Sequence, residues 1–114
     1  PQGGRGSDVA NVRIEGIEFP YPGYLSNIVR QIALQFQPEN PGAPLRADIM
    51  FLIHRDGSVS NLRFVTRSGA YGFDLEAQGA IEAAANSRAF GPLPAAFPDD
   101  VLPVIFSFDP RLIR

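Results

Sequence analysis

The sequence predicts a small α+β domain, a two-layer sandwich in which two helices cover one face of a three-stranded sheet. Three observations lead to this fold class: an apolar helical stripe, a hairpin signal between two apolar runs, and a second helical segment followed by a last apolar run. The chain has 114 residues, of which 45% are hydrophobic. It is therefore long enough for one packed domain and too short for two ordinary ones.

The first helix is predicted over residues 24–37, because apolar side chains recur there at helical spacing and form one stripe. Prolines mark both ends of this segment, with Pro22 before it and Pro38 after it. The stripe consists of Leu25, Ile28, Val29, Ile32 and Phe36. Residues 9–19, which precede the helix, are predicted to form a short strand or an extended arm.

Residues 45–69 are predicted to form a β-hairpin around Asp56 and Gly57. An Asp-Gly pair is a strong hairpin signal, because a type I′ turn needs positive φ at both of its central residues. The run before the turn is apolar on both faces, whereas the run after it is apolar mainly on one. We expect the strand that is apolar on both faces to lie in the middle of the sheet.

The second helix is predicted over residues 73–87, with Asp74 as its N-cap. Its buried stripe is made mostly of small residues, which let a helix lie close to a sheet. These residues are Ala77, Ile81, Ala84 and Ala85. A proline-rich loop follows, and three of its side chains are expected to pack inward: Phe90, Leu93 and Phe97. The last strand is predicted over residues 101–108.

The three strands are predicted in the order 2-1-3, antiparallel or mixed, with the first strand of the hairpin in the centre and both helices on one face. A crossover through the second helix makes the last strand run parallel to the second. The last strand is then an edge, where Pro103 is tolerated because its missing N–H can face solvent. Such an edge can take up an extended peptide as a further strand. The N-terminal segment, residues 11–19, could cover an edge in cis or be donated to a partner.

Charge and cysteine content narrow the possible functions. The net charge is −2, and the ten basic residues are all arginines spread along the chain, which argues against a nucleic-acid-binding protein. The sequence contains no cysteine and therefore no disulfide or thiolate metal site. No apolar run is long enough to cross a membrane, and residues 1–8 have the composition of a flexible linker. We expect the chain to be the C-terminal piece of a longer protein or a processed form, with any membrane anchor upstream.

No catalytic, cofactor-binding or metal site is predicted, and we do not expect an enzyme. The one histidine, His54, has no second histidine or cysteine to act with, and is expected to be a solvated residue at a strand end. Several aspartates could suggest acid–base chemistry, but turn, helix-cap and loop positions explain them better. They are Asp48, Asp56, Asp74, Asp99 and Asp100.

Six short motifs occur in order between Phe19 and Phe108. They are an aromatic–Leu pair at the start of the first helix (Tyr24-Leu25), DGSV in the hairpin, V-x-x-SG at the end of the second strand, FD-x-x-A in the second helix, F-x-PLP in the loop, and FP-x-D-x-L-x-V-x-F-x-F in the last strand. Each motif alone is weak, but their order and spacing are specific. Together they resemble the C-terminal domain of the TonB/TolA family.

This resemblance implies a non-enzymatic periplasmic interaction domain, tethered to the inner membrane by an upstream segment. Family members bind outer-membrane receptors or periplasmic partners and transmit force from a proton-driven motor, and strand addition is implied at the edge strand, 101–108. The alternative is a structural subunit, a scaffold that clamps the periplasmic face of a larger inner-membrane complex through its N-terminal arm and domain surface. The expected organisation is a linker over 1–8, an arm over 9–23, the domain over 24–110 and a tail over 111–114.

Partner-binding residues are expected on the last strand and on the N-terminal arm. Tyrosines on the arm are natural anchors, since tyrosine is enriched in interface hot spots. An ordered lead-in that packs on its own domain is an equal alternative for the arm. The predicted residues of the strand and its end are Val101, Leu102, Pro103, Ile105, Ser107 and Asp109. Those of the arm are Ile14, Ile17, Phe19, Tyr21 and Tyr24.

Overall fold

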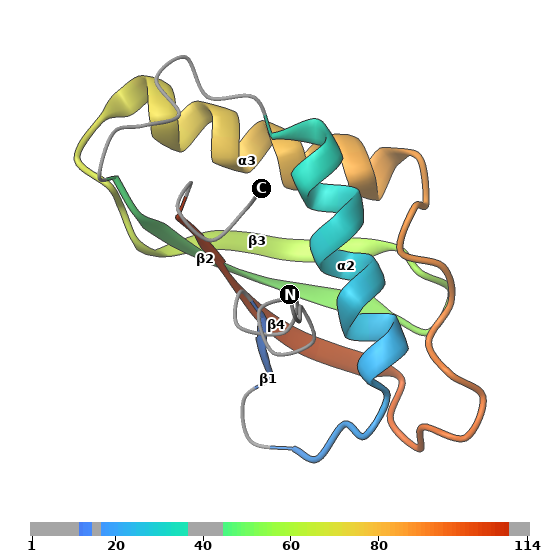
Figure 1. Cartoon of the computed structure of the whole chain (residues 1–114). Helices are drawn as coiled ribbons and strands as arrows, with labels where there is room; N and C mark the ends of the chain where they lie inside the picture. The colour runs from blue at the N-terminus through green and yellow to red at the C-terminus, as the bar shows by residue number, and fades with distance from the viewer. Residues whose placement is uncertain (1–11, 15–16, 37–44, 110–114) are drawn as a thin grey trace, which may run out of the picture.

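In the part of the chain that the structure describes, two helices lie over one face of a four-stranded sheet (Figure 1). The computed structural model describes residues 12–14, 17–36 and 45–109. In chain order the elements are β1 (Val12–Ile14), α2 (Pro22–Gln35), β2 (Ala47–His54), β3 (Val59–Thr66), α3 (Tyr71–Asn86) and β4 (Val101–Phe108). The predicted α+β class and the two layers are confirmed. The linker predicted over 1–8 and the tail predicted over 111–114 lie outside the described residues.

The sheet has the strand order β1-β4-β2-β3, and every neighbouring pair is antiparallel. β2 lies between β3 and β4, as its two apolar faces predict. The three predicted strands lie in the predicted order 2-1-3, as β3-β2-β4. The predicted number of three strands and the edge position of the last strand are wrong, because β1 is a fourth strand that pairs with β4. β1 is held there by Val12, whose side chain is buried against the core. β1 of the N-terminal segment therefore covers part of the β4 edge in cis, at residues 104–106.

The core lies between the sheet and the helices. Alternate residues of β2 and β4 face the helices and are fully buried, because side chains alternate between the two faces of a strand. On β2 these residues are Ala47, Ile49, Phe51 and Ile53, and on β4 they are Leu102, Val104, Phe106 and Phe108. Full burial of a large apolar side chain contributes about 1.5–3 kcal/mol, so these two central strands supply much of the hydrophobic stabilisation.

Both helices pack their apolar faces on this core. α2 begins at Pro22, two positions before the predicted start. Proline suits the first helical position, because its missing N–H would have no partner within the helix there. Its buried residues are Ile28 and Ile32. α3 buries Ile81 together with several alanines, so its backbone lies close to its neighbours, as the small-residue stripe predicts.

The prediction that Asp74 is the N-cap of α3 is wrong. The residue at the cap position is Ala70, and Asp74 lies within the first turn of the helix. Its carboxylate Oδ1 accepts a hydrogen bond from the N–H of Ser68, at 3.0 Å. Asp74 thus fixes the chain that leads into the helix, and its charge suits the positive end of the helix dipole.

The hairpin is confirmed, but its turn is not of type I′. The loop has three residues, Arg55 to Gly57, and Gly57 is the residue of the three with positive φ, at +90°. The His54 N–H donates to the Ser58 carbonyl (2.7 Å) and the Gly57 N–H donates to the His54 carbonyl (2.8 Å). A left-handed residue at the end of a three-residue loop is a common hairpin geometry. Asp56 does not have a positive φ, and its carboxylate Oδ1 accepts a hydrogen bond from the Ser58 N–H at 2.9 Å.

The proline-rich loop after α3 packs on the tip of this hairpin. Its three apolar side chains are buried, as predicted: Phe90, Leu93 and Phe97. The Arg55 guanidinium donates to the carbonyls of Pro94 (3.0 Å) and Phe97 (2.7 Å). A Cβ atom on Gly57 would lie 2.8 Å from the carbonyl oxygen of Gly91, so the two backbones are in close contact. These contacts set the position from which β4 enters the sheet.

Candidate functional site: the β4 edge, the arm and the outer face

β1 covers the middle of the outer edge of β4. Its three residues pair with 104–106, and the last pair joins Ile14 and Val104. The next residue along β4 is Pro103, which has no N–H to donate to a longer ladder. In the described residues, no strand lies beside 101–103 or 107–108 on this side of β4. Most of this edge is therefore not paired by β1.

The residues predicted on β4 fall on both faces of the sheet. Leu102 faces the helices and is fully buried, so a partner cannot reach its side chain. The others point to the face turned away from the helices, which we call the outer face. They are Val101, Pro103, Ile105 and Ser107. Ile105 and Ser107 are buried, as is Asp109 after the strand, and Val101 and Pro103 are half-buried. β4 thus presents its backbone edge to a partner more than its side chains.

The arm residues pack on their own domain. All five predicted arm residues are partly buried against the core: Ile14, Ile17, Phe19, Tyr21 and Tyr24. The Phe19 ring meets the Phe97 ring edge-on, with centroids 5.0 Å apart, and lies 4.9 Å from the ring of Tyr21. Aromatic pairs of this kind contribute about 0.5–1.5 kcal/mol each beyond their buried area. These contacts favour the alternative in which the arm is an ordered lead-in.

Tyr24 joins the start of α2 to the proline-rich loop. Its hydroxyl donates a hydrogen bond to the carbonyl oxygen of Gly91, at 2.8 Å. Burial raises the pKa of Tyr24 to about 12, because a partly buried phenolate would lose solvation. Nearby, the Asn27 side-chain amide donates to the Ala89 carbonyl at 3.1 Å. The arm, α2 and the loop therefore form one connected structure at this end of the domain.

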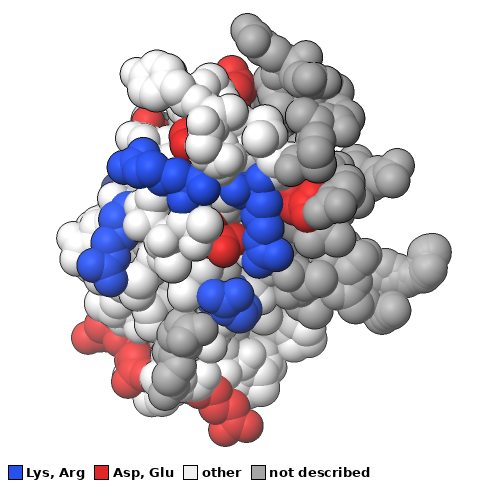
Figure 2. Space-filling model, turned by 90° about the vertical axis from the view of Figure 1, so that its left-hand side faces the viewer, with Lys and Arg blue, Asp and Glu red and all other residues white. Residues whose placement is uncertain are grey.

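A row of four side chains crosses the outer face, one from each strand. Arg13 of β1 is opposite Ile105 of β4, Ile105 is opposite Met50 of β2, and Met50 is opposite Arg63 of β3. The Arg63 guanidinium lies 3.5 Å from the Met50 sulfur. Sequence reasoning missed this row, because it treats the arginines as dispersed. Figure 2 shows basic side chains gathered across one side of the molecule, with small acidic areas between them.

The two ends of the outer face carry polar contacts. At one end, Arg46 Nε lies 3.2 Å from Asp48 Oδ1, and its Nη2 is 3.4 Å from the Ser107 hydroxyl. At the other end, His54 Nε2 lies 2.6 Å from the Ser60 hydroxyl. His54 ends β2 as predicted, but it is half-buried and hydrogen-bonded rather than fully solvated. Each of these polar groups has a structural partner.

β3 contains a bulge at Asn61. Residues 59–64 of β3 lie opposite residues 49–53 of β2, so β3 carries one extra residue over this length. Asn61 has a φ of +55°, in the left-handed region, which asparagine adopts more readily than most residues. Bulges of this kind interrupt the ladder of an edge strand and so limit pairing with other chains. The β3 edge is therefore a poorer strand acceptor than the β4 edge.

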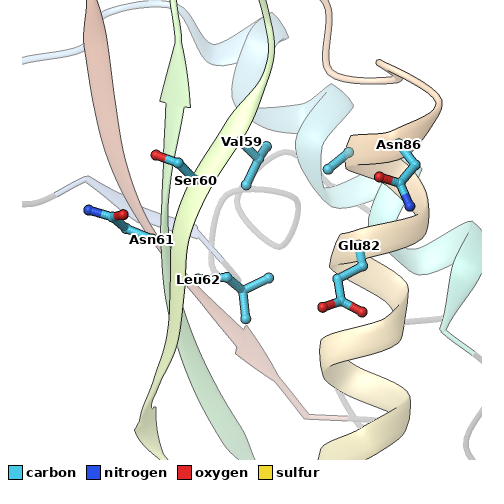
Figure 3. Close-up of a pocket in the computed structure, with 7 residues that line it drawn as sticks. Val59, Ser60, Asn61, Leu62, Glu82 and Asn86 are labelled. Carbon is cyan, nitrogen blue, oxygen red and sulfur yellow. The ribbon is translucent and has the colours of Figure 1, made fainter.

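A groove of about 330 Å³ lies between β3 and α3. Figure 3 shows Val59 and Leu62 pointing from β3 toward α3, and Glu82 and Asn86 pointing from α3 toward β3. Glu82 is the one ionisable residue that lines this groove, and it accepts a hydrogen bond from Gln78 at 3.1 Å. A single carboxylate without a second titratable group does not form an acid–base pair. Over residues 12–14, 17–36 and 45–109, no three His, Cys, Asp or Glu residues are grouped to hold a metal.

A family model described as TonB C terminal matches residues 21–108 of this chain. The match extends from the start of α2 to the end of β4 and leaves β1 before it. No curated protein and no solved structure gives a significant match. Neither helix of the described chain is long and apolar enough to span a membrane.

Proposed function

The chain belongs to the TonB C-terminal family, and we propose that it is a non-enzymatic periplasmic interaction domain that binds a partner by strand addition at the outer edge of β4. One observation carries this proposal: within the described chain, β1 pairs with residues 104–106 of β4, whereas the edge of β4 runs from Val101 to Phe108. The proposed partners are envelope or membrane proteins, and the proposed location is the periplasm, with a tether to the inner membrane upstream.

A partner strand would take the place of β1 on β4. A longer strand gains backbone hydrogen bonds with a net value of about 0.5–1.5 kcal/mol each. It must also replace the burial of Val12, which is 6% exposed. β1 places Val12 opposite Phe106 and Ile14 opposite Val104. We therefore expect the partner segment to carry two apolar residues separated by one residue of any kind.

A disulfide between β1 and β4 tests this proposal. Ile14 and Val104 are directly opposite each other, and such residues have Cβ atoms about 4.5–5.5 Å apart, close to the spacing that a disulfide needs. The sequence has no cysteine that could compete. The Ile14→Cys/Val104→Cys variant and the two single-cysteine variants would be used to capture proteins from envelope extracts.

If β1 must leave β4, capture falls to background when the bridge is oxidised and returns when it is reduced. The single-cysteine variants control for the substitutions themselves and should capture like the wild type under both conditions. Equal capture by the oxidised and reduced double variant would contradict strand addition at this edge.

A second candidate function is a scaffold subunit that clamps the periplasmic face of an inner-membrane complex through the arm and domain surface. The contacts of Phe19 with Phe97 and of Tyr24 with Gly91 favour it, since a packed arm offers a preformed surface. For this function the oxidised variant should still bind, and the protein should purify from membranes at constant stoichiometry with that complex. Recovery of outer-membrane receptors alone would contradict it.

A further inference from the structure

The groove between β3 and α3 lies at the other edge of the sheet from the proposed strand-addition site. β4 and β2 separate β1 from β3, so binding in this groove requires no change at the β4 edge. We propose that the groove is a binding site for an arginine side chain of a partner protein. The methylene stem of the arginine would lie on the apolar wall of the groove, and its guanidinium would bind Glu82 and Asn86.

The bulge at Asn61 builds the apolar wall of the groove. Residues three apart in a regular strand point to opposite faces of the sheet, because side chains alternate. The extra residue in β3 changes this alternation, and Val59 and Leu62 both point toward α3 (Figure 3). Both side chains are half-buried and so keep some exposed surface. Ala85 of α3 also lines the groove, and its small side chain leaves space for an aliphatic stem.

The wall formed by α3 carries the negative charge. Glu82 and Asn86 are exposed, lie one turn apart on the helix and point toward β3 (Figure 3). Gln78 donates a hydrogen bond to Glu82 Oε2 at 3.1 Å. A carboxylate has about four acceptor sites, however, so Glu82 can still accept the parallel N–H groups of a guanidinium. The side-chain carbonyl of Asn86 offers a further acceptor.

No basic side chain of the described chain forms an ion pair with Glu82. In the part of the chain that the structure describes, ion pairs form instead at Asp48, Asp56 and Asp100. Arg88, which follows α3, is bound at the hairpin tip: its Nη1 lies 3.7 Å from Asp56 Oδ2 and donates to the Asp56 carbonyl at 3.4 Å. α3 also has no basic residue in its last turn, where the negative end of the helix dipole favours a cation. The charge at this end of the groove therefore suits a cation from a partner.

The size and the acceptors of the groove favour a basic side chain over a metal ion or a larger ligand. Its volume of about 330 Å³ is at the lower end of the range for small-molecule sites. One carboxylate and one amide supply too few oxygens to enclose Ca²⁺, which takes about 6–8. An arginine combines an apolar stem, which packs along apolar surface, with a planar donor group that matches a carboxylate.

A capped tripeptide with one arginine between two alanines tests this site with the intact chain. Its neutral control contains citrulline, which has the same length but a urea group in place of the guanidinium. Amide NMR shifts of the isotope-labelled protein would map the site and give the Kd. We expect the arginine peptide to shift the amides of Leu62, Ala85 and Asn86 with a Kd of about 1–10 mM, as suits a single side chain. The citrulline peptide should bind at least about fivefold more weakly, because it forms no ion pair.

A matched pair of variants separates the groove from a general charge effect. Glu82→Gln removes the charge and keeps the shape of the side chain, whereas Glu76→Gln makes the same change on the same helix outside the groove. Glu82→Gln should weaken binding of the arginine peptide about fivefold, and Glu76→Gln should leave it within about twofold. Ala85→Leu fills the groove without changing its charge and should abolish saturable shifts. Circular dichroism would confirm that the variants are folded.

Several results would overturn the proposal. These are an arginine peptide that gives no saturable shifts, shifts that map outside the groove, a citrulline peptide that binds equally well, or equal effects of Glu82→Gln and Glu76→Gln. If Ala85→Leu fails to fold, the two peptides and the two glutamate variants still decide the outcome. The oxidised Ile14→Cys/Val104→Cys variant should bind the arginine peptide like the wild type, because its disulfide closes the β4 edge alone. Loss of binding in that variant would place the peptide at β4 and would also overturn the proposal.

Discussion

Replacing Gly57 by alanine should destabilise the domain more than the same substitution at Gly69, another described glycine with positive φ. Two separate costs arise at this position. Gly57 has a φ of +90°, and a left-handed conformation costs a residue with a Cβ atom about 1–2 kcal/mol. The new Cβ would also lie 2.8 Å from the Gly91 oxygen and 2.9 Å from its carbonyl carbon. Forcing two packed backbones apart typically adds about 1–3 kcal/mol, so we expect a total loss of about 2–5 kcal/mol.

Gly69 provides the matched control for the first cost. Its φ is +93°, but no atom lies within 4 Å of the position that a Cβ would take. Gly69→Ala should therefore carry the conformational cost alone, about 1–2 kcal/mol. The difference between the two variants isolates the contact between Gly57 and Gly91, which joins the hairpin tip to the proline-rich loop.

The free energies of unfolding would be measured by urea titration followed by circular dichroism, with the wild type and both variants under the same conditions. For a chain of this length, a loss of 1 kcal/mol corresponds to a fall in Tm of roughly 3–6 °C. If Gly57→Ala costs no more than Gly69→Ala, the close approach to Gly91 does not contribute to stability. If neither variant is destabilised, the assignment of positive φ at these glycines is wrong.

Three further substitutions have expected outcomes. Tyr24→Phe removes the hydrogen bond to the Gly91 carbonyl and should cost about 0.5–1.5 kcal/mol near pH 7. Burial raises the pKa of Tyr24 to about 12, so the neutral hydroxyl stabilises the fold fully below about pH 10 and this stabilisation is lost as pH rises toward 12. Urea titrations should therefore show a smaller loss of unfolding free energy at alkaline pH in Tyr24→Phe than in the wild type. Equal losses in the two proteins would refute this. Gly79→Ala, in the exposed interior of α3 with open space around its Cβ position, should stabilise the domain by about 0.5–1 kcal/mol, and a destabilisation would show an unrecognised contact. Arg55→Met keeps the stem but removes the guanidinium hydrogen bonds to the carbonyls of Pro94 and Phe97; the Pro94 carbonyl keeps the Phe97 N–H as a donor. The substitution should cost about 1–3 kcal/mol in thermal or urea unfolding and should shift the amide NMR signals of the loop. Unchanged loop signals would contradict this role.

Local periodicity was a reliable guide to the elements of this domain. The α2 stripe, the two apolar runs of the hairpin and the alternation in β4 each depend on residues within one segment, so their burial follows from that segment's own pattern. Phe90, Leu93 and Phe97 were also predicted to face inward, and they do. The central place of β2 follows equally from its apolar character on both faces.

Finer geometry was less predictable, because it depends on alternatives with nearly equal local energy. An Asp-Gly pair suits both a two-residue turn and a three-residue loop. In the observed three-residue hairpin loop, Gly57 lies against Gly91 of the proline-rich loop, and the hairpin's own sequence does not encode this contact. Asp74 has the residue type of an N-cap, but the helix begins earlier and the carboxylate binds Ser68 instead. The bulge at Asn61 shifts the register between β3 and β2, and this register depends on the partner strand as well as on β3 itself.

The sequence by itself determined the fold class, the family, and the location of the helices and of the three longer strands, because these depend on patterns and motifs along the chain. The tertiary structure decided which strand lies at the edge and which side chains share a face. β1 and β4 are far apart in the sequence but pair in the sheet, because β4 is the long strand whose edge is left open when the core packs. The row from Arg13 to Arg63 exists because strand order and register place four distant residues in one line. No periodicity within a single segment encodes that line.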